Sequence, residues 1–441
     1  MFHRVLIANR GAIARRVIQA CNALGVESVA LYSEADADAP YLAEATRALP
    51  LPGVKAADSY LNMPALLGRL AESGADAVHP GYGFLSESAG FARAVADAGA
   101  HFIGPAPHWL ERMGDKVAAR ALMAERGFPV FAGSGALESL REARDFAAEA
   151  GYPLMLKPVG GGGGIGMQVL RDDADLAAAF ERCARLADAA FADPRLFLET
   201  FCMAPRHVEI QVLGDGAGGA VHLYERACSL QLRHPKVVEE SPAPGLERDA
   251  LDALAMQAER ITGELGYDNV GTVETLRAGD GRYGFLEMNT RVQVEHGVTE
   301  AVTGLDLVAT QISLAAGGAL PARPQLQGHA LEVRVYAEHP RTALPSCGRL
   351  TRFRPPVMHG VRVDTGYAEG QTVTPYYDPL LAKVIGFGGS REQAIGRVLV
   401  ALKGFEVLGV DTNMALLRAV LQDDDFLAGR IDTGYLYSHR W

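Results

Sequence analysis

The chain has 441 residues, of which 49% are hydrophobic and 22% charged, as in a globular enzyme of about two to four domains. The net charge of −11 argues against a sequence-wide affinity for nucleic acid or an anionic membrane. No run of about 18 apolar residues is present, so no membrane span is predicted. Five scattered cysteines without CxxC spacing, and first residues without a secretion signal, predict a reduced, zinc-free, cytoplasmic protein.

The N-terminal part of the chain alternates short apolar strands with amphipathic helices. We expect strands at residues 4–8, 29–32 and 77–78, and helices at residues 12–24 and 63–73. This βαβ rhythm predicts a parallel, doubly wound sheet. The loop Asn9-Arg10-Gly11 follows the first strand, where such sheets bind ligands. It lacks a full GxGxxG, which disfavours a dinucleotide-binding fold.

A run of glycines at residues 160–164 separates two apolar strands, at residues 154–156 and 167–170. Glycine removes side chains, so that backbone N–H groups can close over phosphate oxygens; a flexible hairpin is the alternative. The run is not a P-loop, because Lys and Ser or Thr do not follow it. Lys157 and Lys116 add two cations suited to phosphates, although each alone is typical of a solvated surface.

A series of polar residues runs from Glu287 to Glu295, with Glu274 thirteen residues upstream, in a region (204–320) whose pattern predicts an antiparallel sheet packed with helices. Strand alternation places five polar side chains on the same face: Glu287, Asn289, Arg291, Gln293 and Glu295. Glu274, Glu287 and the Asn289 amide are hard ligands suited to Mg²⁺ held with nucleotide phosphates. The cation, amide and acid that follow suit a small anion beside that metal. The alternative is an exposed sheet face with solvated charges.

A second polar segment lies at residues 225–240. It includes Gln231, Arg233, His234 and Lys236, which suit an anionic substrate facing the nucleotide. A polar loop with structural salt bridges is the alternative. The last region, at residues 325–441, mixes strands with a helix-rich end.

A hinge strand, a glycine-rich lid after a lysine and an acid–x12–acid–x–Asn metal site together resemble the ATP-grasp superfamily. Within it, the chain resembles the biotin carboxylases from end to end. The matching motifs, besides the glycine lid, are residues 7–11 (IANRG), 59–62 (SYLN), 79–87, 102–105 (FIGP), 113–116 (MGDK), 206–209 (RHVE), 225–240, 287–296 and 375–378 (PYYD).

This resemblance implies an ATP-grasp fold of α/β and α+β class. It would combine an N-terminal doubly wound parallel-sheet domain, a glycine-rich lid subdomain and a C-terminal mixed domain. The expected divisions are residues 1–112 (N-terminal biotin carboxylase domain), 113–130 (connecting helices), 131–203 (lid), 204–325 (central domain) and 326–441 (C-terminal domain).

The resemblance also implies ATP-dependent carboxylation of biotin with bicarbonate, through carboxyphosphate. The expected ATP-binding residues are Lys116, Lys157, Gly162, Gly163, Gly164, Glu199, Cys202, His207, Gln231, His234 and Leu276. Mg²⁺ or Mn²⁺, as two ions, would be bound by Glu274, Glu287 and Asn289. Bicarbonate would lie against Lys236, Arg291, Gln293, the Val294 backbone and Glu295, and biotin against Tyr82 and Arg362. The expected catalytic residues are Glu295 as general base, Arg362 at the biotin enolate, and Lys236 and Arg291.

A homodimer, a biotinylated carrier protein or domain and a carboxyltransferase component are the implied partners. An Ala-Met-Lys-Met carrier motif is absent, so biotin is expected to be attached elsewhere. The residue types at Ile165 and Gly297 are similar to those in the biotin carboxylase domain of urea carboxylases. The sequence does not define which molecule is finally carboxylated.

Four positions depart from the family pattern, each by loss of a charged or hydrogen-bonding residue. They are Ala12, Ala227, Leu232 and Pro235. They leave two alternatives open: a diverged ATP-grasp ligase that joins an acid to an amine, and a non-catalytic ATP-binding regulator. Retained Tyr82, Lys236 and Arg362 argue against the ligase.

Overall fold

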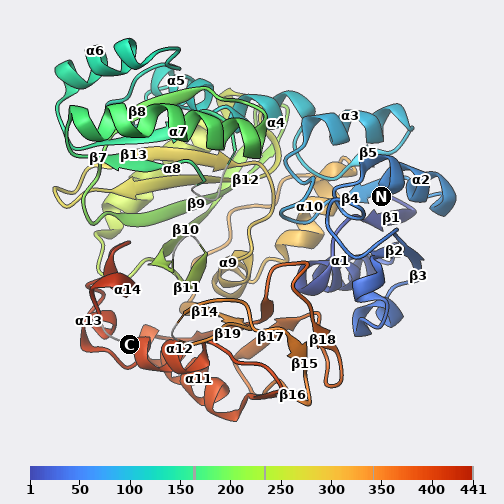
Figure 1. The fold of residues 1–441 in the computed structure, drawn as a ribbon. Helices are drawn as coiled ribbons and strands as arrows, with labels where there is room; N and C mark the ends of the chain where they lie inside the picture. The colour runs from blue at the N-terminus through green and yellow to red at the C-terminus, as the bar shows by residue number, and fades with distance from the viewer. Residues whose placement is uncertain (162–164, 233–234, 341, 440–441) are drawn as a thin grey trace.

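The computed structural model describes residues 1–161, 165–232, 235–340 and 342–439. Figure 1 shows the N-terminal domain on the right, the lid at the upper left and the C-terminal region below. Parallel and antiparallel sheets both occur, which confirms the predicted mixed class. Within these described ranges, no helix has the length and apolar character needed to cross a membrane.

The N-terminal domain is the predicted parallel sheet, with strand order β3-β2-β1-β4-β5. Its strands are β1 (Arg4–Ile7), β2 (Glu27–Tyr32), β3 (Arg47–Pro50), β4 (Ala77–His79) and β5 (His101–Phe102). Its helices are α1 (Gly11–Leu24), α2 (Met63–Ser73) and α3 (Ala89–Asp97), with 3₁₀ turns at Glu34–Asp36 and Pro40–Glu44. Helix α1 buries Ile13 and Val17 at helical spacing and ends at Gly25, whose φ of 68° favours glycine.

The lid is a small antiparallel sheet of order β7-β6-β8, comprising β6 (Leu154–Pro158), β7 (Gln168–Leu170) and β8 (Leu196–Thr200). Helices α6 (Leu140–Ala150) and α7 (Asp173–Phe191) pack on it. The connection before it holds α4 (Pro107–Gly114) and α5 (Lys116–Glu125). The Asp115 side chain accepts a hydrogen bond from Ala118 N (2.9 Å) and so caps the start of α5.

An eight-stranded sheet of order β13-β12-β9-β10-β11-β14-β19-β17 is the centre of the molecule. Its strands are β9 (Arg206–Asp215), β10 (Ala220–Gln231), β11 (Lys236–Ser241), β12 (Asp268–Arg277), β13 (Tyr283–Asn289), β14 (His329–Tyr336), β17 (Val361–Thr365) and β19 (Leu380–Gly388). Helices α8 (Arg248–Glu264), α9 (His296–Thr303) and α10 (Leu307–Ala315) pack around it. All neighbouring strands are antiparallel, as predicted. The sheet continues past residue 325, and the division into domains stays a prediction.

The C-terminal region completes the fold below this sheet (Figure 1). Its remaining strands are β15 (Gly348–Arg349), β16 (Arg352–Arg354), β18 (Thr372–Val373) and β20 (Glu406–Leu408). Its helices are α11 (Arg391–Gly404), α12 (Met414–Val420), α13 (Asp424–Leu427) and α14 (Tyr435–Ser438). Helix α11 packs its apolar side on β14 and β19.

The strand expected to continue to Glu295 ends earlier. Strand β13 stops at Asn289, and Glu295 is the residue before α9. The Thr290 N–H donates to the Glu87 carboxylate (3.2 Å), from another part of the chain, so it does not continue the ladder. The prediction of one continuous strand face was therefore wrong beyond Asn289.

Arg226 is a wholly buried cation that ties β9 and β10 to α9. It donates to Glu209 Oε1 (2.6 Å), Gln211 Oε1 (2.8 Å) and Thr299 Oγ1 (2.9 Å). Arg226→Met leaves these buried acceptors without their donor, so we expect about 3–5 kcal/mol less free energy of unfolding in a denaturant titration. Arg282→Met, which removes an exposed ion pair, is the control and should change little. Equal losses in both variants would contradict the expectation.

Candidate active site

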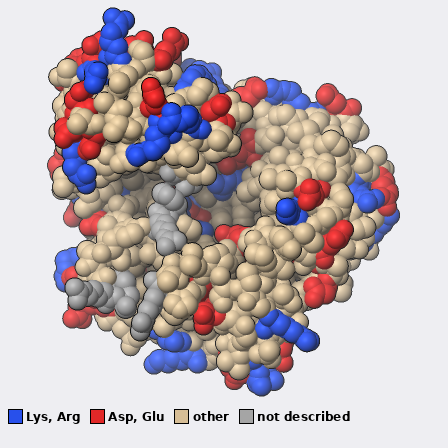
Figure 2. Space-filling view, viewed as in Figure 1, with Lys and Arg blue, Asp and Glu red and all other residues tan. Residues whose placement is uncertain are grey.

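A cavity of about 1260 Å³ lies between the lid, the central sheet and the N-terminal domain. Figure 2 shows the hollow beside the lid, with Lys and Arg atoms inside it. The predicted residues that line it are Tyr82, Lys116, Lys157, Glu199, Cys202, His207, Gln231, Lys236, Glu274, Leu276, Glu287, Asn289, Arg291, Gln293, Val294 and Glu295. Gly162, Gly163, Gly164 and His234 lie outside the described residues.

The two acids of the predicted metal site lie side by side. Glu274 on β12 and Glu287 on β13 are direct cross-strand partners, and Asn289 follows on the same face. Glu274 accepts hydrogen bonds from Asn289 Nδ2 (2.8 Å) and Gln293 Nε2 (2.9 Å). Burial alone would raise the pKa of Glu274, but Lys236 and His207 outweigh burial and lower it, so this carboxylate stays ionised.

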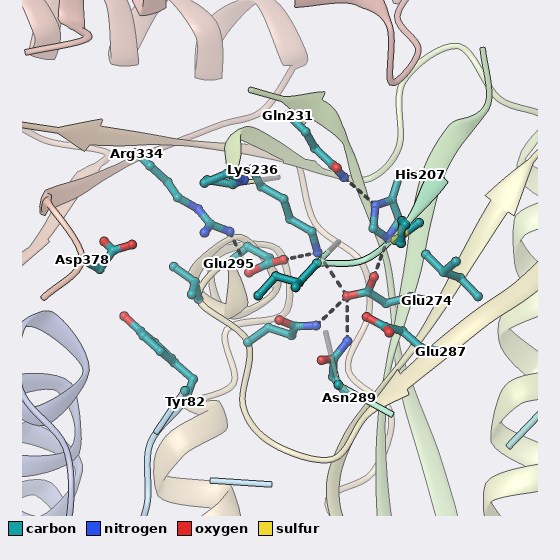
Figure 3. Close-up of a pocket in the computed structure, with 18 of the residues that line it drawn as sticks. Tyr82, His207, Gln231, Lys236, Glu274, Glu287, Asn289, Glu295, Arg334 and Asp378 are labelled. Carbon is teal, nitrogen blue, oxygen red and sulfur yellow. Dashed lines mark hydrogen bonds and ion pairs between the residues drawn. The ribbon is translucent and has the colours of Figure 1, made fainter. Parts of the chain in front are cut away.

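Lys236, at the start of β11, is the cation at the centre of the cavity (Figure 3). Its Nζ lies 2.5 Å from Glu209, 2.5 Å from Glu295 and 3.2 Å from Glu274. Burial would lower the pKa of Lys236, but the three carboxylates raise it well above its usual value. Glu209 was not among the expected site residues. Lys236 therefore remains a charged donor among acids.

Glu295 is buried, and two cations contact its carboxylate. Lys236 lies at Oε1 (2.5 Å) and Arg334 at Oε2 (3.0 Å). Burial opposes its ionisation, but these cations outweigh burial and hold the pKa of Glu295 well below its usual range. An ionised carboxylate is the form that a general base requires.

The lid end of the cavity carries a second set of paired charges. Lys157 on β6 lies 2.8 Å from the Glu199 carboxylate on β8. Lys116 Nζ lies 3.0 Å from Glu287 and donates to the Gly161 carbonyl. The two cations thus extend from the lid to the acids of the central sheet, an arrangement suited to the phosphates of a nucleotide.

Arg291 is held by a residue that the sequence pattern did not single out. Its Nε donates to Glu87 (3.0 Å), and its Nη2 donates to Asn289 Oδ1 (2.7 Å). Burial would lower the pKa of Arg291, but Glu87 outweighs it and raises that pKa. Glu87 follows β4 in the N-terminal domain, so two distant segments meet here.

The structure does not bring Arg362 to this cavity. Arg362 on β17 lines a separate cavity of about 420 Å³. Its guanidinium is paired with Asp364 (2.6 Å) and Glu300 (2.5 Å). The structure therefore corrects the prediction that Arg362 contacts biotin. Strand β14 borders the cavity, and β19 lies between β14 and β17, which carries Arg362.

Arg334 on β14 is the arginine that lines the cavity. Figure 3 shows it beside Glu295, on the side of the cavity where Tyr82 and Asp378 lie. The sequence did carry a signal for it. Glu332 and Arg334 alternate with Val333 and Val335 in a buried strand, and charged residues are rarely buried unless they are paired.

Three family models match the chain. Residues 1–110 match "Biotin carboxylase, N-terminal domain", residues 115–323 match "Carbamoyl-phosphate synthase L chain, ATP binding domain", and residues 332–438 match "Biotin carboxylase C-terminal domain".

Curated relatives match over the whole chain. The biotin carboxylase of Halalkalibacterium halodurans is 46% identical, over 100% of this chain and 98% of that protein. Biotin carboxylase 2 of Bacillus subtilis is 43% identical, over 100% of both. Human mitochondrial pyruvate carboxylase is 43% identical over 98% of this chain, which covers 38% of that longer protein.

Solved structures have the same fold. The biotin carboxylase domain dimer of Hydrogenobacter thermophilus 2-oxoglutarate carboxylase, in complex with MgADP, ADP and bicarbonate, has a TM-score of 0.97 and 40% identity, covering 100% of this chain and 98% of that one. A Campylobacter jejuni biotin carboxylase complex with β-γ-ATP has a TM-score of 0.97 and 38% identity, covering 100% and 99%. The chain belongs to the biotin carboxylase family of the ATP-grasp superfamily.

Proposed function

We propose that the cavity described above is the site where this protein carboxylates biotin, using ATP and bicarbonate. The activity is that of the family: an ATP-dependent ligase reaction that forms ADP and phosphate. The observation that carries the assignment to this cavity is Glu295, an ionised buried carboxylate between Lys236 and Arg334, beside the acid pair Glu274 and Glu287. A base and a site for phosphates and metal thus share one cavity.

ATP is assigned to the lid end of the cavity. Lys116 and Lys157 would contact its phosphates, and the β8 end with Leu276 would contact the adenine. Glu274, Glu287 and Asn289 offer only oxygen ligands, and hard cations such as Mg²⁺ prefer these. Mg²⁺ held by these residues would neutralise charge on the phosphates during transfer. Both carboxylates already lie beside positive charge, since Lys116 contacts Glu287 and Lys236 contacts Glu274.

Bicarbonate is assigned to the space bounded by Lys236, Arg291, Gln293 and the Val294 backbone. Glu295 takes its proton, and the bicarbonate oxygen attacks the γ-phosphorus while ADP leaves. The resulting carboxyphosphate breaks down to CO₂ and phosphate. Phosphate then takes the proton of the biotin ureido nitrogen, and that nitrogen attacks CO₂.

Biotin is assigned to the end of the cavity that holds Tyr82 and Arg334. Deprotonation of the ureido group places negative charge on its oxygen, and a fixed guanidinium stabilises such charge most when water is excluded. Arg334 is 6% exposed and held by carboxylates, so it is preorganised for this role. We therefore assign to Arg334 the role that the sequence resemblance gave to Arg362.

The partners follow from the activity. The protein works with a biotin carrier, and we propose that a carboxyltransferase component receives the carboxyl group. A homodimer is proposed because the Hydrogenobacter thermophilus domain is described as a dimer. The urea-type branch, based on Ile165 and Gly297, stays a prediction, and so does any effect of Ala12, Ala227, Leu232 and Pro235.

ADP release with free biotin and bicarbonate, each omitted in turn, tests the proposed function. We expect turnover that requires both substrates and Mg²⁺. Turnover that ignores bicarbonate and responds to an amine would instead support a carboxylate–amine ligase. ATP binding without any turnover, by protein whose fold is intact by circular dichroism, would support a non-catalytic regulator.

A further inference from the structure

Two buried cations face each other on the sheet beneath α9. Arg334 on β14 and Lys383 on β19 are direct cross-strand partners, and they are 6% and 1% exposed. Like charges in directly opposite positions destabilise an antiparallel pair, and burial makes each unpaired charge more costly. Packing alone does not explain this pair, because a lysine in a fully buried strand position is rare unless it holds a partner.

Each of the two cations contacts the same short segment of chain. Arg334 Nη2 donates to the Glu295 carboxylate (3.0 Å), and Lys383 Nζ donates to the Val294 carbonyl (2.6 Å). The Val294 carbonyl belongs to the peptide group that leads into Glu295, directly before α9 begins. Glu295 is thus held at its side chain by one cation and at its backbone by the other.

The carbonyl is the shortest contact of Lys383. Its two acidic neighbours, Glu332 Oε2 and Asp364 Oδ2, both lie 3.4 Å from Nζ. Burial, only partly offset by Lys383, raises the pKa of Glu332 to about 7, so this acid is not a full counter-charge near neutral pH. The ammonium therefore lies closest to the backbone of the active-site loop, with the two carboxylates farther away.

The orientation of this peptide determines how two active-site groups lie. Rotation of the Val294–Glu295 peptide would move the Glu295 N–H and the direction of the Glu295 side chain together. Helix α9 packs on β14 and β19, so the sheet beneath it can hold the loop rigidly. A general base acts only when it lies within hydrogen-bond reach of the proton that it removes.

We propose that Lys383 is a positioning residue for the bicarbonate step: through the Val294 carbonyl it holds the loop that presents Glu295. The inference rests on the proposed function, since it assigns Glu295 to bicarbonate. Lys383 itself does not line the cavity, so it would not touch a substrate bound there. Its effect therefore passes through the backbone.

Lys383→Met tests the inference, because methionine keeps most of the aliphatic stem and removes the ammonium. We expect kcat/KM for bicarbonate to fall by about 10- to 100-fold, the cost of a small misplacement at a reacting centre. The KM for ATP and the Kd for ATP should stay as in the wild type, since the lid contacts do not involve Lys383. Lys383→Arg, which keeps a donor, should restore part of the loss.

The matched control is Arg391→Met. Arg391 is partly buried and pairs with the buried Glu240 (2.6 Å) beside the same sheet, but it does not contact the loop. It should lower stability without changing the bicarbonate dependence. If Lys383→Met unfolds, the double variant Lys383→Met/Glu332→Gln also removes an acid that the lysine leaves behind, while Asp364 keeps its pair with Arg362. It should fold and keep the bicarbonate defect.

Two results separate this inference from the proposed function. Wild-type protein without bicarbonate-dependent ADP release would overturn the proposed function itself. An active wild type, together with a folded Lys383→Met or double variant whose bicarbonate kinetics are unchanged, would overturn only the role of Lys383. A defect of equal size in Arg391→Met would also overturn it, because lost stability would then account for the effect.

Discussion

Glu295→Gln should reduce bicarbonate-dependent ADP release by about 10²- to 10⁴-fold in kcat, the range for loss of a general base. Glutamine keeps the shape of the side chain and can still accept a hydrogen bond from Lys236, but it cannot take a proton. ATP binding should persist, because Lys116 and Lys157 lie at the other end of the cavity. Steady-state kinetics, with ATP affinity measured separately, check this expectation.

The low pKa of Glu295 is compatible with a role as base once an anion enters. In this structure Lys236 is shared between Glu295 and two other acids. Bicarbonate beside Lys236 and Arg291 would compete for these cations, and weaker pairing makes the carboxylate more basic. Because its pKa is depressed, Glu295 becomes protonated only as pH falls well below the ordinary range of a carboxyl group. Loss of kcat/KM in mild acid, which reports the free enzyme, should therefore have another origin.

Glu300→Gln is the control for Glu295→Gln. Glu300 lies on α9 and faces the smaller cavity. Like Glu295, it is paired with two cations, here two arginines. Its replacement should lower stability and leave ADP release near the wild-type value. If Glu295→Gln retained turnover, or if both variants lost it equally, Glu295 would not be the base.

The chemistry of this site could be predicted from local sequence more fully than its geometry. Glu274 and Glu287 were expected to meet, and they do so as cross-strand partners. Strand alternation failed after Asn289, because Glu87 from another domain takes the next backbone donor. Arg291, Gln293 and Glu295 still line the cavity, from a loop and a helix start. Local periodicity does not contain such long-range contacts.

Arg362 and Arg334 give a second example in which local sequence does not contain a long-range contact. Both arginines lie on strands of one sheet, and each alternates with apolar residues. Which strand borders the cavity depends on the order β14-β19-β17, which is set by tertiary pairing and not by either segment. A resemblance that matched motifs along the chain therefore selected the wrong arginine for the cavity.

Arg334→Met should reduce biotin-dependent turnover by about 10²- to 10³-fold, the cost of removing a preorganised charge from a developing anion. Arg362→Met should leave biotin turnover nearly unchanged, since its guanidinium pairs with Asp364 and Glu300 in the other cavity. The two variants remove the same charge from the same sheet, but from two different cavities. Initial rates across a range of biotin concentrations provide the measurement.

A second readout separates a role at biotin from a role at Glu295, because Arg334 contacts both. If Arg334 acts on biotin, slow ADP release measured with bicarbonate and without biotin should persist in Arg334→Met, while the stimulation by biotin disappears. Loss of the biotin-independent reaction as well would mean that Arg334 chiefly holds Glu295 (3.0 Å) in place. A large loss of biotin turnover in Arg362→Met, with Arg334→Met active, would restore the assignment made from sequence. Because the two guanidiniums lie in separate cavities, a loss confined to Arg362→Met is the pattern that this site does not allow.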